Sequence, residues 1–136
     1  MNLEGIINIS GKQGLYKIIS KSKNSIIIES LIDKKRIPIY SQNNINSLED
    51  IGIYTHEDTV PLLDIFKNIA IKENYKKCIS SKSLKNELED YFRDIIPEYD
   101  EDRVYMSDIK KVFQWYNLLQ DAGLIKISKS KKKENE

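Results

Sequence analysis

The chain has 136 residues, of which 40% are hydrophobic and 32% are charged, and its formal net charge is +1. A chain of this length forms one domain, or two very small ones, and can bury a core of its own. No stretch reaches the roughly 18 apolar residues of a membrane span, and the first residues lack the basic region and cleavage site of a signal peptide. A single cysteine excludes an internal disulfide, so we expect a cytoplasmic protein.

The N-terminal part alternates short β-rich runs with polar turns. This pattern predicts strands over residues 14–20, 25–32, 36–40 and 51–55. Residues 43–47 are predicted as a loop, and the spacing of Leu3, Ile6 and Ile7 predicts one short helical turn. Four short antiparallel strands form a strongly bent sheet or a small SH3-like barrel, and either needs a cover on its exposed apolar face.

The strand predicted over residues 36–40 has two distinct sides. Ile37 and Ile39 point to one side and Arg36, Pro38 and Tyr40 to the other. Because proline has no N–H to donate to a ladder, we expect this strand at an edge of the sheet.

The rest of the chain has helical periodicity. Helices are predicted over residues 59–73, 83–96 and 107–123, with Thr59, Ser83 and Ser107 as N-caps and Gly123 just beyond the last helix. The fold class is therefore α+β. We expect a β module over residues 1–57, a helical part over 58–127 and a disordered basic tail over 128–136.

Few residues could carry chemistry. His56 is the only histidine and Cys78 the only cysteine, so zinc sets of the usual composition cannot be assembled. Two lysines precede Cys78 and would lower its pKa, but we expect this thiol to be half-buried and structural. The acidic run 97–108 lacks the glycine and glutamate positions of a calcium loop. We therefore predict no metal, no cofactor and no enzymatic activity.

The segment "GKQG", residues 11–14, is not a phosphate-binding loop. Such a loop needs four residues between its glycines and then Gly-Lys-Ser/Thr at the start of a helix. Here the lysine lies between the glycines and a strand follows, so we expect a tight turn.

A basic surface on the β module is the first candidate binding site. Residues 1–47 carry seven Lys or Arg against three acidic residues. Tyrosines set among lysines on a β surface can stack bases and contact phosphates, which predicts an accessory module for RNA or a ribonucleoprotein. The residues expected there are Lys12, Tyr16, Lys34, Lys35, Arg36 and Tyr40.

The alternative is a protein–protein adaptor. Trp115 and Tyr116, in the last predicted helix, would then form an aromatic patch for a partner. The competing interpretation is that both side chains belong to the core.

The sequence contains the segments "SGKQGLYKIIS", "IESLIDKKRIPIY", "SLEDIGIYT" and "YDEDRVYMSDIKKVFQWYNLLQDAGLI". These four segments resemble a family of small cytoplasmic proteins of unknown function found chiefly in Bacteroidetes. The resemblance covers residues 1 to about 127 and implies an N-terminal SH3-like barrel followed by helices. It implies no known activity and no functional residues. Gln13 stands where the family's glycine turn has proline, and the charged tail is shorter than the resemblance implies.

Overall fold

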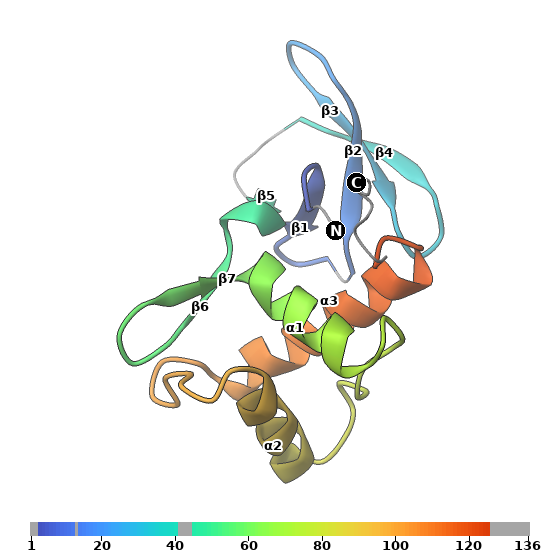
Figure 1. Cartoon of the computed structure of the whole chain (residues 1–136). Coiled ribbons are helices and arrows are strands. Elements are labelled where there is room, and N and C mark those ends of the chain that lie inside the picture. The colour runs from blue at the N-terminus through green and yellow to red at the C-terminus, as the bar shows by residue number, and fades with distance from the viewer. Residues whose placement is uncertain (1–2, 13, 41–44, 126–136) are drawn as a thin grey trace, which may run out of the picture.

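The computed structural model describes residues 3–12, 14–40 and 45–125. Its strands are β1 (Ile6–Ile9), β2 (Tyr16–Lys21), β3 (Ile26–Ser30), β4 (Arg36–Ile39), β5 (Ile45–Ser47), β6 (Gly52–Tyr54) and β7 (Thr59–Pro61) (Figure 1). Its helices are α1 (Leu62–Lys72), α2 (Lys85–Ile95) and α3 (Met106–Asp121), with a 3₁₀ turn at Leu48–Asp50. The predicted α+β class is confirmed, and no helix in these described ranges could span a membrane.

The first five strands form an antiparallel sheet in the order β4-β3-β2-β1-β5. Within the described residues β4 and β5 lie at opposite edges and do not pair with each other, so the sheet is open. This agrees with the prediction of a bent sheet, and the described strands do not close into an SH3-like barrel. β6 and β7 make a separate two-stranded sheet at one side (Figure 1).

Pro38 lies where the sequence predicted, in an edge strand. The N–H of Ser30 donates to the carbonyl of Lys35 at 2.9 Å, which sets the hydrogen-bonding alternation of the β3–β4 pair. By that alternation, residue 38 faces away from β3. The missing N–H of Pro38 is therefore at the free edge, where it costs no ladder bond and discourages further strand pairing.

The N-terminal helical turn was a wrong prediction, because residues 6–9 form strand β1. β1 pairs with both β2 and β5 and is buried on both faces. Ile6 packs into the larger core with the helices, and Ile7 packs into a smaller cluster on the opposite face. A strand buried on both sides loses its alternation, so its apolar spacing was misread as helical.

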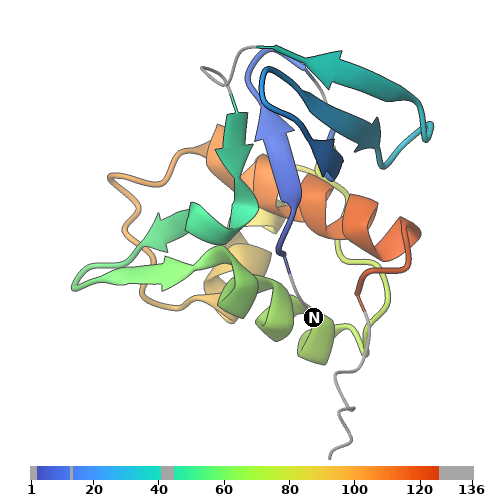
Figure 2. The ribbon, with the colours of Figure 1, turned by 90° about the horizontal axis from the view of Figure 1, so that it is seen from above.

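The two faces of the five-stranded sheet have separate hydrophobic clusters. The smaller is built from strand residues alone: Ile7, Ile9, Ile26 and Ile28, with partly buried neighbours from β2, β4 and β5. The larger lies between the other face and the helices, and α3 runs beneath the sheet (Figure 2). The helices therefore supply the cover that the bent sheet needs.

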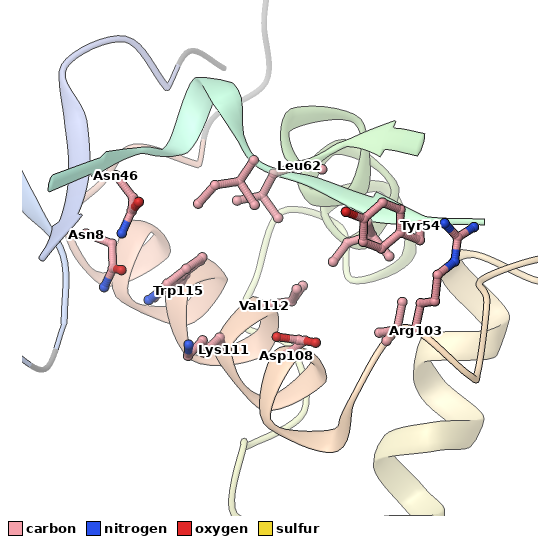
Figure 3. Close-up of a pocket in the computed structure, with 13 residues that line it drawn as sticks. Asn8, Asn46, Tyr54, Leu62, Arg103, Asp108, Lys111, Val112 and Trp115 are labelled. Atoms are coloured by element: carbon pink, nitrogen blue, oxygen red, sulfur yellow. The ribbon is translucent and has the colours of Figure 1, made fainter. Parts of the chain in front are cut away.

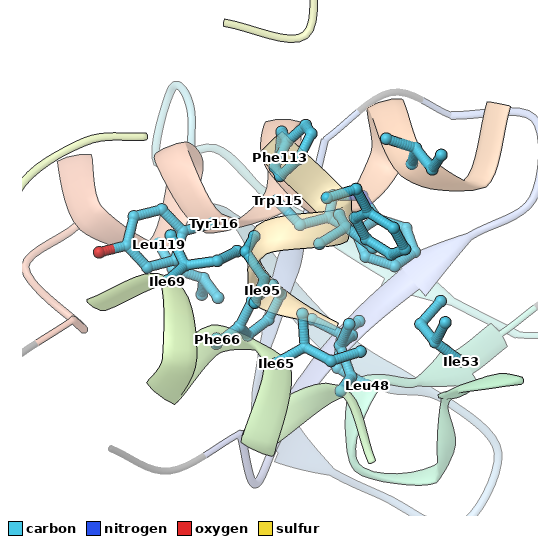
Figure 4. Close-up of a cluster of buried hydrophobic side chains, with 14 of the residues drawn as sticks. Leu48, Ile53, Ile65, Phe66, Ile69, Ile95, Phe113, Trp115, Tyr116 and Leu119 are labelled. Carbon is cyan, nitrogen blue, oxygen red and sulfur yellow. The ribbon is translucent and has the colours of Figure 1, made fainter. Parts of the chain in front are cut away.

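Aromatic side chains from all three helices meet in the larger core (Figure 4). Phe92 and Phe113 pack edge to face with ring centroids 5.9 Å apart, and Phe66 lies 6.1 Å from Tyr116. Leu48, from the short 3₁₀ turn after β5, is fully buried in the same core. Because residues of the sheet and of the helices share one core, the two predicted parts stabilise each other.

The residues at the N-cap positions of the three helices differ from the predicted ones. Thr59 belongs to β7 rather than capping α1, and α2 and α3 have Leu84 and Tyr105 at their N-cap positions instead of Ser83 and Ser107. Carboxylates inside the first turn do the capping: Leu84 N–H donates to Glu87 at 3.2 Å, and Tyr105 N–H donates to Asp108 at 2.9 Å.

The end of α3 agrees with the prediction. Gly123 has φ +77° and directly follows the C-cap residue Ala122, which is the left-handed position that favours glycine. Ile125 then turns back into the core. The predicted boundary at residue 57 stays a prediction, and the predicted tail 128–136 lies outside the described residues.

Candidate binding cleft

The three lysines predicted to contact RNA gather at one end of the sheet. Lys12 is on the turn between β1 and β2, and Lys34 and Lys35 are on the turn between β3 and β4. The two turns are joined where Leu31 N–H donates to the carbonyl of Leu15 at 3.0 Å. All three lysine side chains are exposed.

The predicted aromatic part of that surface is divided. Tyr16 opposes Ile7 in the register and packs against the small isoleucine cluster. Arg36 lies on the other side of β4, where its Nε is 3.3 Å from Glu29, and Tyr40 is exposed directly after the end of β4. Since adjacent residues of a strand face opposite sides, Tyr16 and Arg36 are on different faces of the sheet. The six residues therefore do not form one continuous surface.

Trp115 and Tyr116 do not form the predicted exposed patch. Tyr116 is fully buried, and its hydroxyl donates to the carbonyl of Lys76 at 2.8 Å. Trp115 is 6% exposed and belongs to the larger core. The reason is that the apolar face of α3 turns inward under the sheet and takes both side chains with it.

The structure shows the surroundings of Cys78 and His56, the two residues considered for chemistry. Burial, followed by the nearby charge of Glu73, raises the pKa of the Cys78 thiol to about 12, so the expected lowering by its lysine neighbours is wrong. His56 is exposed on the turn between β6 and β7. Among the described residues no group of three or more His, Cys, Asp or Glu side chains could hold a metal ion.

A cleft of about 300 Å³ opens between α3, β6 and the edge of the five-stranded sheet (Figure 3). Its lining comes from six separate segments of the chain. The residues are Asn8, Asn46, Ile51, Gly52, Ile53, Tyr54, Leu62, Arg103, Val104, Asp108, Lys111, Val112 and Trp115. The floor is apolar and the ends are polar, which is the usual composition of a ligand site.

The indole N–H of Trp115 is the most unusual group in this cleft. No hydrogen bond to it is formed by any residue in the described part of the chain, although the side chain is only 6% exposed. Its nitrogen points toward the end of the cleft occupied by Asn8 (Figure 3). A buried tryptophan N–H normally finds an acceptor, and leaving it without one costs about 1–3 kcal/mol.

The backbone of β6 contributes a second set of polar groups. Thr55 N–H donates to Asp58 and Leu62 N–H donates to Ile51, which sets the bonding alternation of the β6–β7 pair. By that alternation the N–H and C=O of Gly52 face away from β7. Because Gly52 lines the cleft, its backbone groups form an open strand edge there.

The far end of the cleft is closed by Arg103. Its Nε lies 2.7 Å from Asp100, its Nη2 donates to the carbonyl of Thr55 at 3.1 Å, and its guanidinium lies 4.5 Å from the centre of the Tyr54 ring. The hydrogen bond from Arg103 lowers the pKa of Asp100. These contacts fix the loop before α3 against β6.

Lys111 and Asp108 line the helix side of the cleft. Asp108 accepts the Tyr105 N–H and so caps α3. Lys111 is exposed and has no ion pair with any residue in the ranges 3–12, 14–40 and 45–125. With Arg103 engaged by Asp100, Lys111 is the cation available to a ligand.

A larger hollow of about 540 Å³ lies on the other face of the sheet, over the small isoleucine cluster. Its charged side chains, Glu4, Lys21 and Glu49, are exposed at the rim. Because it has no buried donor comparable to the Trp115 indole among the residues that line it, the smaller cleft is the better candidate.

The cleft could not be found from sequence patterns. Trp115 fits the buried face of α3, Asn8 directly follows the residues predicted as a helical turn, and Asn46 lies in a predicted loop. Only the pairing of Asn8 with Asn46 across β1 and β5 brings the two amides together at one end.

Comparison with known proteins supports the family assignment made from the sequence. Residues 51–119 match a family model described as a domain of unknown function (DUF6852), and residues 3–48 match another such model (DUF5606). A solution NMR structure of a Bacteroides vulgatus protein, a structural genomics target, is 41% identical. The match covers 92% of this chain and 90% of that chain, with a TM-score of 0.74. No curated protein matches the chain.

Proposed function

Because the chain belongs to a family defined as a domain of unknown function, whose name carries no activity, we propose from its own geometry that it is a non-enzymatic peptide-binding module. Its binding site is the cleft between β6 and α3. This assignment follows the adaptor alternative, but it replaces an exposed aromatic patch by a groove that has Trp115 in its floor.

The observation that carries this proposal is the unpartnered indole N–H of Trp115. A donor buried in this way is satisfied by water in the free protein and by an acceptor on a ligand in the complex. Peptides carry such an acceptor at every carbonyl.

The shape of the cleft fits a short extended segment. At ~1.5 Å per residue, the stretch of α3 from Asp108 to Trp115 is about 10 Å long, which matches about three residues of extended peptide. The open edge at Gly52 provides one N–H and one C=O for pairing with that segment. Addition of a strand to a sheet edge, with a helix on the other side of the groove, is a known mode of peptide recognition.

The single tryptophan allows a direct test. In ¹⁵N-labelled protein, only one indole N–H resonance is expected, and it reports on Trp115 alone. A pool of random N-acetylated tetrapeptides should shift this resonance and those of Gly52 and Val112. Asn46→Arg, which fills the mouth of the cleft, should abolish the shifts, and Asn24→Arg, on the exposed turn before β3, should not. Absence of any shift in the cleft overturns the proposal.

RNA binding is the second candidate, and it is supported by the gathering of Lys12, Lys34 and Lys35 at one end of the sheet. Contacts to phosphates release counterions, so affinity for single-stranded RNA should fall as salt rises. Changing the three lysines to glutamine should weaken binding and flatten its salt dependence, whereas Lys110→Gln on α3 should change neither. Affinity that is indifferent to salt would refute this candidate.

A further inference from the structure

We infer that the cleft recognises the C-terminal carboxylate of its peptide, held by the indole N–H of Trp115 and the ammonium group of Lys111. This inference rests on the proposed function and specifies the chemistry of the ligand.

The first step is the distribution of donors along the cleft. Trp115 and Lys111 lie toward the end that has Asn8 and Asn46, while Tyr54 and Arg103 mark the other end (Figure 3). Trp115 and Lys111 can only donate, and the two amides can donate as well. None of these four side chains bonds to another group in the part of the chain that the structure describes.

The second step is charge. Arg103 is paired with Asp100, while Asp108 accepts the Tyr105 N–H and keeps its own negative charge. Lys111 is the cation of this end of the cleft that forms no ion pair with a described residue, and it lies beside the buried indole donor of Trp115. A single carboxylate satisfies both groups, because an ionised acceptor forms stronger hydrogen bonds than a neutral carbonyl.

The third step is the direction of the peptide. β6 begins at Gly52 and ends at Tyr54, which lies beside Arg103 at the end of the cleft away from the two amides (Figure 3). Beyond Gly52 its edge is occupied, because the carbonyl of Tyr54 accepts the N–H of Asp100 at 2.9 Å. A segment that pairs antiparallel with β6 has its C-terminus at the amide end, beside Trp115 and Lys111. A parallel segment would place its N-terminus there, where Lys111 repels a free N-terminal ammonium group.

Three peptide pools test the inference on the full chain. The first contains random N-acetylated tetrapeptides without Asp or Glu and with a free C-terminal carboxylate. The second is the same pool with a C-terminal amide, and the third is the amide pool with Glu fixed at the last position. The Trp115 indole resonance is followed in each titration, with a small dye-labelled peptide from the first pool used to measure affinity.

The free-acid pool should bind about tenfold more tightly than the amide pool, which is the effect of one charge-assisted hydrogen bond. Lys111→Gln should remove about the same factor for the free acid and change nothing for the amide. Lys110→Gln, on the same helix but outside the cleft, is the matched control and should leave both affinities unchanged.

The outcomes separate this inference from the proposed function. Equal binding of acid and amide pools overturns carboxylate recognition and leaves peptide binding intact. Equal binding of the Glu-amide and free-acid pools overturns the C-terminal assignment, since a side-chain carboxylate then suffices. No indole shift with any pool overturns both proposals.

Discussion

Asn117, in α3, accepts the backbone N–H of Cys78 at 2.8 Å across 39 residues of sequence. Its amide nitrogen also lies 3.4 Å from the carbonyls of Cys78 and Ile79. One partly buried side chain thus satisfies three backbone groups of the connection between α1 and α2. That connection has no regular secondary structure of its own, so these bonds fix it against α3.

Asn117→Ala should therefore destabilise the protein by about 1–3 kcal/mol, because the N–H of Cys78 loses its acceptor in a partly buried place. The free energy of unfolding in urea measures the effect. Gln114→Ala, on the exposed side of the same helix, is the control and should change it by less than about 0.5 kcal/mol. Equal effects of the two substitutions would contradict the role given to Asn117.

The Cys78 thiol should be inert in the native state. Burial raises its pKa to about 12, so almost no thiolate is present at neutral pH. Alkylation by iodoacetamide should be slower than in the urea-unfolded chain by about a hundredfold or more. Mass spectrometry of the single cysteine gives both rates, and similar rates in the two states would show that the thiol is accessible.

The stability of the protein should fall at alkaline pH. The pKa of Tyr91 is raised by burial and then by the carboxylate of Glu73, to which the Tyr91 hydroxyl donates. Burial also raises the pKa of Tyr116 to about 12. Groups whose pKa is raised by folding lose their protons first in the unfolded chain. Their contribution to the free energy of unfolding is complete below the pKa values of the unfolded chain, which are 9.0 for Cys78 and 10.0 for the tyrosines. It decreases as pH rises above those values.

Urea titrations of the wild type at a series of pH values should show a constant free energy of unfolding up to about pH 9 and a decline beyond it. Tyr91→Phe removes one ionising group and should make this decline shallower. A wild-type curve that stays flat to pH 11, or a Tyr91→Phe curve as steep as the wild type, would refute the assignment.

Two glycines of the first turn should differ in their tolerance of alanine. Both have left-handed backbones, with φ +86° at Gly11 and +85° at Gly14. A Cβ at Gly14 would lie 2.7 Å from Cδ1 of Ile32, whereas a Cβ at Gly11 would meet open space. Gly11→Ala should therefore cost about 1 kcal/mol for its backbone alone, and Gly14→Ala should cost somewhat more, because the outer end of the exposed Ile32 side chain must also move aside.

Thermal unfolding of the two variants beside the wild type compares these costs directly. The order of the two variants in stability is the decisive result, since both carry the backbone cost and only a Cβ at Gly14 meets a neighbouring side chain. A Gly11→Ala variant that is the less stable of the two would contradict the packing described for this turn.

Much of the architecture could be predicted from periodicity. The β-branched runs of β2, β3 and β4 and the apolar stripes of the three helices were placed within a few residues, because each has one buried and one exposed side. β1 and β5 were missed because β1 is buried on both faces and β5 has only three residues. Neither strand therefore shows enough alternation of apolar and polar residues to be predicted as a strand.

By itself, the sequence determined an α+β chain in which strands precede helices, an edge position for Pro38 and a core face for α3, because these depend on local backbone chemistry and apolar spacing. Only the tertiary structure decided that the predicted lysine and tyrosine surface is divided between two faces, and that a cleft opens between α3 and β6. Those features depend on strand register and on contacts between segments up to about a hundred residues apart. A one-residue change of register would move each side chain to the other face of the sheet.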